Sequence, residues 1–126
     1  MAGERVLVVE DNDLNMKLVR DILQATGYSP LEASSGEEAL ALAAENAPAL
    51  VLMDIQLPDL DGSEALQRLR SDERTAGIPV LALTAQAMQG DRERFLAAGF
   101  DGYLSKPVDV DELIETVRRY CDGGSE

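Results

Sequence analysis

Carboxylate side chains stand at the ends of two short apolar segments of this chain. Glu10 and Asp11 come at the end of segment 5–10, and Asp54 comes at the end of segment 49–54. If the two segments are neighbouring parallel strands, all three carboxylates lie at one edge of a sheet. Two unit charges about 4 Å apart repel by roughly 4 kcal/mol at an effective dielectric near 20, so such a cluster requires protons or a cation.

A magnesium ion is the cation that suits these side chains. The chain has no His and a single Cys, so a metal site must use oxygen ligands. Mg²⁺ prefers octahedral oxygen coordination, and in proteins one or two carboxylates usually hold it beside water and phosphate oxygens. We predict that Asp11 and Asp54 bind Mg²⁺, for which Mn²⁺ is a candidate substitute. Glu10 either binds the ion directly or, as we favour, acts through a bound water.

A hydroxyl and an ammonium group follow two further apolar segments. Thr84 comes directly after segment 78–83, and Lys106 comes directly after segment 101–105. A carboxylate nucleophile, a hydroxyl donor and an ammonium group around a metal ion are the parts needed to form an aspartyl phosphate. We therefore predict that Asp54, Thr84 and Lys106 carry the chemistry, which needs positioning and charge neutralisation but no general base.

Strand-like and helix-like patterns alternate along the chain. The expected strands cover 5–10, 30–33, 49–54, 78–83 and 101–105, and the expected helices cover 13–26, 36–46, 63–72, 86–98 and 110–121. The first and third strands are apolar without alternation, as is typical of parallel strands covered on both faces. The alternation predicts an α/β fold, a (βα)5 doubly wound parallel five-stranded sheet with its site at the carboxyl edge.

Two of the expected helices show a clear apolar face. The face of the last helix is predicted to contain Val110, Leu113, Ile114, Val117 and Cys121, and that of the first helix Leu18, Val19, Ile22 and Leu23. Gly27 and Gly99 stand where a left-handed residue would end a helix. These faces predict which side of each helix packs on the sheet.

The length and charge of the chain limit the classes of function. Its 126 residues fit one domain, expected over 1–121 with a flexible tail over 122–126. The net charge of −13 repels nucleic-acid phosphates and anionic lipid. The apolar runs are far shorter than the roughly 20 residues that span a bilayer, and no signal peptide is recognisable. We expect a cytoplasmic protein, a monomer or weak homodimer, that binds neither nucleic acid nor membranes.

The motifs at successive strand ends resemble those of the response-regulator receiver domains. The motifs are Glu10-Asp11-Asn12, Met53-Asp54 with Leu57-Pro58 and Asp61-Gly62 beyond it, Leu83-Thr84-Ala85, and Tyr103-Leu104-Ser105-Lys106-Pro107. They occur in the family's order, and the likeness runs from about Arg5 to Tyr120. The chain resembles in particular the single-domain regulators of the DivK type. A set of independent motifs is far more specific than any one of them.

The resemblance implies a flavodoxin-like fold with strand order 2-1-3-4-5. It also implies that a histidine kinase or a histidine phosphotransfer protein phosphorylates Asp54. The implied metal ligands are Glu10, Asp11, Asp54 and the backbone carbonyl of Gln56. Thr84 and Lys106 would contact the phosphoryl group.

The resemblance further implies a conformational switch. Tyr103 matches the family's switch aromatic and would move together with Thr84, although core packing explains an aromatic residue there equally well. Lys106-Pro107 matches a cis peptide bond of the family. Gln56 and Gln86 flank the site and are expected to tune hydrolysis of the aspartyl phosphate, which the protein would itself promote.

Signalling is expected to occur by direct protein contact. After Tyr120 only six residues remain, which leaves no room for an effector domain. The expected output surface is formed by helix 86–98, strand 101–105 and helix 110–121. The alternative is that the partner docks on the first helix near Asn15, Met16 and Arg20. A relay role and an endpoint role are both compatible with the sequence.

Three other classes of protein can be weighed against this interpretation, and the sequence disfavours each of them. An aspartyl-nucleophile phosphatase would carry Asp-x-Asp, but Gln56 occupies the position of its acid/base. A flavin- or nucleotide-binding module would need a phosphate-cradling loop after the first strand, where this chain has acidic residues. A receiver fold that has lost its chemistry would lack a site residue, and none is missing.

Overall fold

A parallel five-stranded sheet forms the centre of the molecule. The computed structural model describes residues 4–57, 59–84, 91–106 and 108–121. The strands are β1 (Arg5–Val9), β2 (Ser29–Ala33), β3 (Leu50–Asp54), β4 (Val80–Thr84) and β5 (Gly102–Ser105), in the order β2-β1-β3-β4-β5. The helices are α1 (Asp13–Ala25), α2 (Gly36–Asn46), α3 (Gly62–Ser71), α4 (Asp91–Ala98) and α5 (Val110–Cys121). The predicted fold class and strand order are confirmed.

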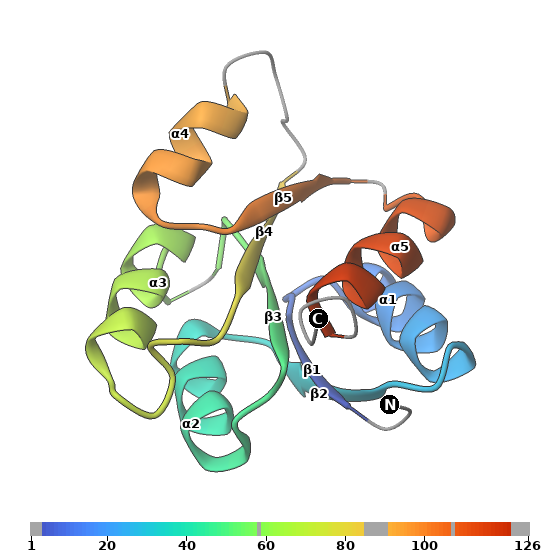
Figure 1. Ribbon diagram of the computed structural model, residues 1–126, viewed down its shortest axis with the longest axis horizontal. Coiled ribbons are helices and arrows are strands. Elements are labelled where there is room, and N and C mark those ends of the chain that lie inside the picture. Colours follow the sequence, from blue (N-terminus) through green and yellow to red (C-terminus); the bar gives the residue numbers. More distant parts are fainter. Residues whose placement is uncertain (1–3, 58, 85–90, 107, 122–126) are drawn as a thin grey trace.

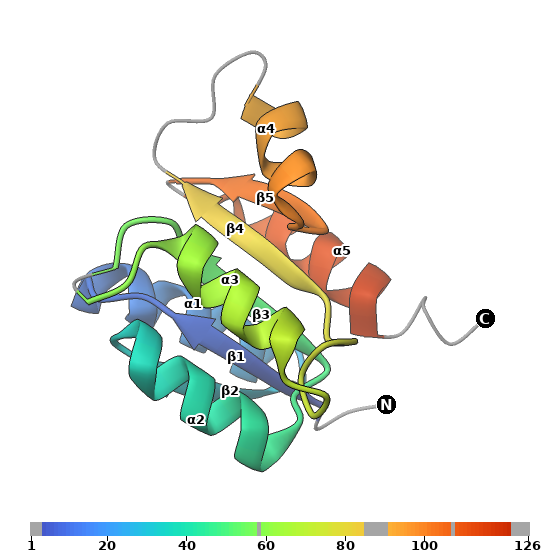
Figure 2. The ribbon, with the colours of Figure 1, turned by 90° about the vertical axis from the view of Figure 1, so that its left-hand side faces the viewer.

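Helices cover both faces of the sheet. In Figure 1 the helices α2, α3 and α4 lie on one side of the sheet, and α1 and α5 lie on the other. Figure 2 shows α2 and α3 in front of the strands. Alternate residues of β1 enter the two layers: Val6 and Val8 pack with α1 and α5, and Leu7 and Val9 pack on the opposite side. This explains why β1 is apolar without alternation.

The register of the strands brings their carboxyl ends to one edge. Val9 is paired with Met53, so the residues that follow β1 lie beside the end of β3. Thr84 is paired with Ser105, which places Lys106 just beyond the end of β4. From β1 the chain continues to β2 on one side, and from β3 it continues to β4 on the other side. Ligand sites of doubly wound sheets lie at this point, where the strand order changes direction.

Side-chain caps fix where the helices begin. Asn12 accepts a hydrogen bond from Asn15 N at 3.0 Å at the start of α1. Ser35 and Asp61 cap α2 and α3 in the same way. Gly99 follows α4 with φ of 111°, in the left-handed region that favours glycine. The predicted helix boundaries are therefore confirmed to within a residue, except that residues 86–90 of the fourth helix lie outside the described residues.

Two residues of the predicted apolar faces are exposed. Leu18 is 39% exposed, and Met16 is buried on α1 instead. At 3.6 residues per turn Leu18 lies about 100° round the helix from the buried Val19, whereas Met16 lies about 60° from it. Val110 has the predicted direction but occupies the first turn of α5 and is 47% exposed. The periodicity gave the direction of each face but not its edges.

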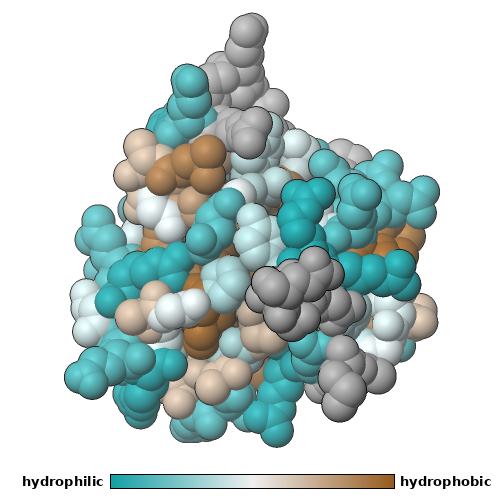
Figure 3. All heavy atoms as spheres, in the orientation of Figure 1, coloured by the Kyte–Doolittle hydropathy of each residue, from teal (hydrophilic) through white to brown (hydrophobic). Residues whose placement is uncertain are grey.

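The surface is dominated by polar side chains. Hydrophilic residues cover much of the face in Figure 3, and apolar residues are exposed in separate patches, one of them over α4. Leu96 of α4 is 42% exposed. No helix among the described residues is both long enough and apolar enough to cross a membrane.

Arg70 ties the amino-terminal ends of β4 and β5 to α3. Its guanidinium donates to Asp101 Oδ2 at 2.9 Å and to three backbone carbonyl oxygens. The carbonyls belong to Ala76 (3.1 Å), Ile78 (2.6 Å) and Gly99 (3.3 Å). Asp101 Oδ2 also accepts a hydrogen bond from Val80 N at 2.8 Å. The network lies at the opposite end of the strands from the acidic residues and serves stability.

Arg70→Met is expected to lower the free energy of unfolding by about 2–3 kcal/mol. Hydrogen bonds from a charged group contribute roughly 1.5–3 kcal/mol each, but the Arg70 side chain is 30% exposed, so water replaces part of the network in the variant. The measurement is urea unfolding followed by circular dichroism, since the chain has no Trp. The control is Arg68→Met, which removes exposed ion pairs with Glu37 and Glu64 and should change stability by less than about 1 kcal/mol. Equal losses in both variants would contradict the role of Arg70.

Candidate functional site

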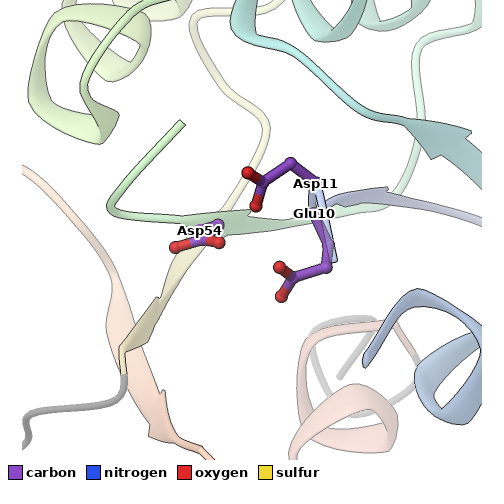
Figure 4. A group of neighbouring side chains, drawn as sticks. All are labelled: Glu10, Asp11 and Asp54. Carbon is purple, nitrogen blue, oxygen red and sulfur yellow. The ribbon is translucent and has the colours of Figure 1, made fainter. Parts of the chain in front are cut away.

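Three carboxylates converge at the carboxyl edge of the sheet. Glu10 and Asp54 are buried, whereas Asp11 is exposed. One carboxylate oxygen from each residue lies within 4.8 Å of the other two. Figure 4 shows the three side chains around one shared space, with Glu10 and Asp11 coming from the end of β1 and Asp54 from β3. The structure thus brings together the acidic residues that the sequence predicted to meet.

Lys106 supplies the positive charge next to the two buried carboxylates. Its Nζ lies 2.7 Å from Glu10 Oε1 and 3.0 Å from Asp54 Oδ2. The contact with Asp54 is a hydrogen bond. Glu10 Oε1 accepts no hydrogen bond of good alignment, so its contact with Lys106 is ionic. Lys106 therefore holds both carboxylates at once.

Charge and burial shift the protonation of this pair. Burial raises the pKa of the Glu10 carboxyl; the contact with Lys106 lowers it, and the proximity of Asp54 raises it further. Burial alone lowers the pKa of Lys106, but the contacts with Glu10 and Asp54 outweigh burial and hold that pKa above its ordinary value. The raised pKa of Lys106 shows that the two carboxylates stabilise its charged form, whereas the raised pKa of Glu10 reflects mainly the cost of burying its charge.

The Asp54 side chain is oriented through both of its oxygens. Asp54 Oδ1 accepts a hydrogen bond from Gln56 N at 2.9 Å, while Oδ2 faces Lys106. The loop after β3 is closed by a hydrogen bond of 2.8 Å from Gly62 N to Ile55 O. A Cβ on Gly62 would lie 3.0 Å from Ile55 Cα, so glycine permits this close approach. The loop therefore positions Gln56 next to Asp54.

A cleft of about 430 Å³ opens over these groups. It is lined by Glu10, Asp11, Asn12, Asn15, Asp54, Ile55, Gln56, Thr84, Arg94, Phe95 and Lys106. The cleft thus includes every predicted catalytic and metal-binding residue. A wider hollow of about 780 Å³ lies over α3 and is lined by exposed or half-buried side chains, but among the described residues its carboxylates do not converge as those of the cleft do. We therefore place the candidate site at the cleft.

Thr84 lies at the inner wall of the cleft. It is buried, and its carbonyl oxygen accepts a hydrogen bond of 2.8 Å from Lys106 N. This bond fixes the start of the segment that carries the Lys106 side chain. Gln86 and the Lys106-Pro107 peptide bond, which the sequence also singled out, lie outside the described residues.

Tyr103 packs in the layer that contains α4. Its ring centroid lies 5.8 Å from that of Phe95, at an interplanar angle of 48°. Phe95 also packs edge-to-face on Phe100, with the centroids 6.1 Å apart. Tyr103 is half-buried and does not line the cleft, but its neighbour Phe95 does. The structure thus shows the packing role of Tyr103 and leaves its switching role a prediction.

Besides Ile55, which directly follows Asp54 in the chain, sequence reasoning missed two residues of the cleft, Arg94 and Phe95. Both come from α4, whose weak apolar periodicity gave no indication of the side that faces the site. Phe95 could have been recognised as a core residue because it is a large apolar residue in a predicted helix. Nothing in the sequence marked Arg94.

The carboxylate group fits a small divalent cation. Its oxygen donors are the hard ligands that Mg²⁺ prefers, and their spacing allows a shared ion. Asp11 is exposed, so an ion can reach the group from solvent. Lys106 pairs with both Glu10 and Asp54, so one positive charge faces three carboxylates. A bound cation would neutralise the remaining negative charge.

A doubly wound sheet with an acidic site at its carboxyl edge is the arrangement expected of a receiver domain. Residues 6–118 match the family described as the response regulator receiver domain, and the chain belongs to that family. It is 51% identical over 115 residues to the polar-differentiation response regulator DivK of Brucella ovis, covering 91% of this chain and 94% of DivK. The chain is therefore a receiver domain of a two-component system.

Experimental structures of other receivers are similar to this one. The receiver domain of the sensor histidine kinase PA1611 of Pseudomonas aeruginosa has a magnesium ion coordinated in its active-site cleft. It is 38% identical, with a TM-score of 0.87 over 95% of this chain and 98% of that one. The receiver domain of Ssk1 of Saccharomyces cerevisiae was crystallised with the histidine phosphotransfer protein Ypd1. That structure is 30% identical, with a TM-score of 0.89 over 99% and 93% of the two chains.

Proposed function

We propose that this protein accepts a phosphoryl group on Asp54 from a histidine kinase or a histidine phosphotransfer protein. The observation that carries the proposal is the position of Asp54 in the cleft, beside Lys106 and two further carboxylates. In the transfer, a bond forms between a carboxylate oxygen of Asp54 and phosphorus. The bond from phosphorus to the donor nitrogen breaks, and its electron pair stays on the imidazole.

Magnesium is the proposed cofactor, with Mn²⁺ as a substitute. Asp11, Asp54 and the carbonyl of Gln56 would hold the ion, and Glu10 would act through a bound water. The ion supplies charge neutralisation for the phosphoryl oxygens. The magnesium site of the PA1611 receiver supports this assignment.

Lys106 and Thr84 have separate proposed roles. Lys106 lies at hydrogen-bond distance from Asp54 Oδ2, so its ammonium group is placed to contact a phosphoryl group carried by that carboxylate. Thr84 lines the same cleft and would donate its hydroxyl to a phosphoryl oxygen. Movement of Thr84 toward the phosphoryl group would change the packing of Tyr103 and bias α4 between two arrangements.

Hydrolysis would return the protein to its first state. A water molecule attacks phosphorus, which releases inorganic phosphate and regenerates the Asp54 carboxylate. Gln56 lines the cleft next to Asp54 and is proposed to tune this rate together with Gln86. The protein therefore promotes phosphotransfer to itself and its own dephosphorylation, and it does not turn over other substrates.

Two surfaces are proposed for partners. The phosphodonor would dock on α1, where Leu14 is 79% exposed and Asn15 lines the cleft. The complex of Ssk1 with Ypd1 supports a histidine phosphotransfer protein as such a partner. A downstream protein would bind the surface of α4, β5 and α5. Met16 is buried and takes no part in docking on α1.

We further propose that the protein acts in the cytoplasm as a monomer or weak homodimer. Its net charge of −13 argues against nucleic acid as a partner.

The proposal is tested by incubating the wild-type protein with Mg²⁺ and a small phosphodonor such as acetyl phosphate. The intact mass should rise by one phosphoryl group, and a metal chelator should prevent the rise, because the carboxylates then repel the donor. No gain in mass under any donor concentration would contradict the proposed function.

A further inference from the structure

A second cation faces the acidic cleft from α4. Among the described residues that line the cleft, Lys106 and Arg94 are the cationic ones. Lys106 already bridges Glu10 and Asp54 within the site. Arg94 is an exposed residue that lines the cleft, so a molecule entering the cleft from solution can contact its side chain.

The ring of Phe95 holds the Arg94 guanidinium at the cleft. Arg94 Cζ lies 5.3 Å from the centroid of that ring, within the range of a cation–π contact. Phe95 is itself buried and fixed by its ring contacts with Phe100 and Tyr103. Because the ring is buried beneath the cleft wall, the cation–π contact favours a position of the Arg94 guanidinium beside the cleft.

The chemistry of a phosphodonor makes a cation at this place useful. A phosphoryl group that approaches Asp54 carries negative charge and meets the carboxylates of Glu10 and Asp11. A guanidinium presents planar paired donors that match phosphoryl oxygens, and charge in a cleft changes the local concentration of ionic ligands. Arg94 can thus attract the donor without occupying the position of Lys106.

We propose that Arg94 binds the phosphoryl oxygens of the incoming phosphodonor at the mouth of the cleft and thereby raises the rate of Asp54 phosphorylation. The proposal rests on the proposed function of Asp54. The substrate class is a small anionic phosphodonor, an acyl phosphate or a phosphoramidate. Arg94 binds and orients the donor and takes no part in bond making.

Two measurements on Arg94→Gln should change in opposite directions. At donor concentrations below saturation the rate of mass gain should fall about five- to tenfold, since a charge-assisted contact with the donor is lost. Mg²⁺ should bind about twofold more tightly, because a positive charge near the metal site is removed. Calorimetric titration measures the Mg²⁺ affinity. A merely structural role of Arg94 would weaken labelling and Mg²⁺ binding together.

Two further variants act as controls. Arg94→Lys keeps the charge but loses the paired donors and should recover part of the labelling rate. Arg118→Gln removes an exposed arginine of α5 that does not line the cleft, and should label and bind Mg²⁺ as the wild type does. Added salt should slow the wild type more than Arg94→Gln.

The outcomes separate this inference from the proposed function. If the wild type takes up a phosphoryl group and Arg94→Gln does so at the same rate, the role of Arg94 is overturned and that of Asp54 stands. A parallel loss of labelling and of Mg²⁺ affinity in Arg94→Gln also overturns the inference, because it assigns Arg94 to structure. A wild type that takes up no phosphoryl group overturns both.

Discussion

Asp54→Asn is expected to leave the protein folded and to abolish its phosphorylation. The amide of Asn lacks the charged oxygen that attacks phosphorus, but it has nearly the same shape as the carboxylate. Its carbonyl oxygen can still accept the hydrogen bond that Gln56 N donates to Asp54 at 2.9 Å. The amide NH2 then faces Lys106 and the contact with its ammonium group is lost, but removal of one charge from three crowded carboxylates relieves repulsion, so stability should change little.

The measurement for Asp54→Asn is intact mass after incubation with Mg²⁺ and a small phosphodonor. The control is Asp21→Asn, which removes an exposed carboxylate that pairs with Lys17 on α1, outside the cleft. The control should gain one phosphoryl group as the wild type does. If Asp54→Asn gains a phosphoryl group to the same extent as the wild type, a residue other than Asp54 is the nucleophile.

Lys106→Met is expected to destabilise the metal-free protein by about 3 kcal/mol, the lower end of the range for breaking a buried ion pair, because the Lys106 side chain is still 15% exposed. Lys106 Nζ contacts both Glu10 and Asp54, and loss of one partner leaves buried charge uncompensated. The Met side chain replaces most of the apolar stem of Lys, so the loss reports the charge rather than packing. Mg²⁺ should then stabilise the variant more than the wild type, because the cation replaces a missing charge.

Urea unfolding with and without Mg²⁺ measures both effects of Lys106→Met. Lys17→Met is the matched control, since Lys17 pairs with Asp21 on the surface and is 63% exposed. Its stability should change by less than about 1 kcal/mol, with the ordinary response to Mg²⁺. If Lys106→Met and Lys17→Met behave alike, the ion pairs of Lys106 do not contribute to folding.

The carboxylate cluster could be predicted from sequence because parallel strands share a direction. Apolar segments marked the strands, and the residues just after them had to reach the same edge. Glu10, Asp11 and Asp54 therefore could be placed together without any contact being known. The same reasoning placed Thr84 and Lys106 at that edge.

The helices show where sequence periodicity stops being informative. It predicted the buried direction of α5, where Leu113 and Val117 are fully buried, but it also included the exposed Val110. On α1 it chose Leu18 over Met16. Periodicity gives the rotation of a side chain about its own helix, whereas burial also depends on how far the neighbouring layer extends.

The sequence by itself determined the fold class, the strand ends that carry chemistry and the oxygen character of any metal site, because these follow from local pattern and composition. The strand order was implied by the family resemblance, and the pairing of the strands confirmed it. Only the tertiary structure decided that Lys106 bridges Glu10 and Asp54, that Arg70 ties β4 and β5 to α3, and that Arg94 faces the cleft. Each of these contacts joins side chains from segments far apart in the chain or depends on how a helix is oriented against the sheet, and no local periodicity encodes either.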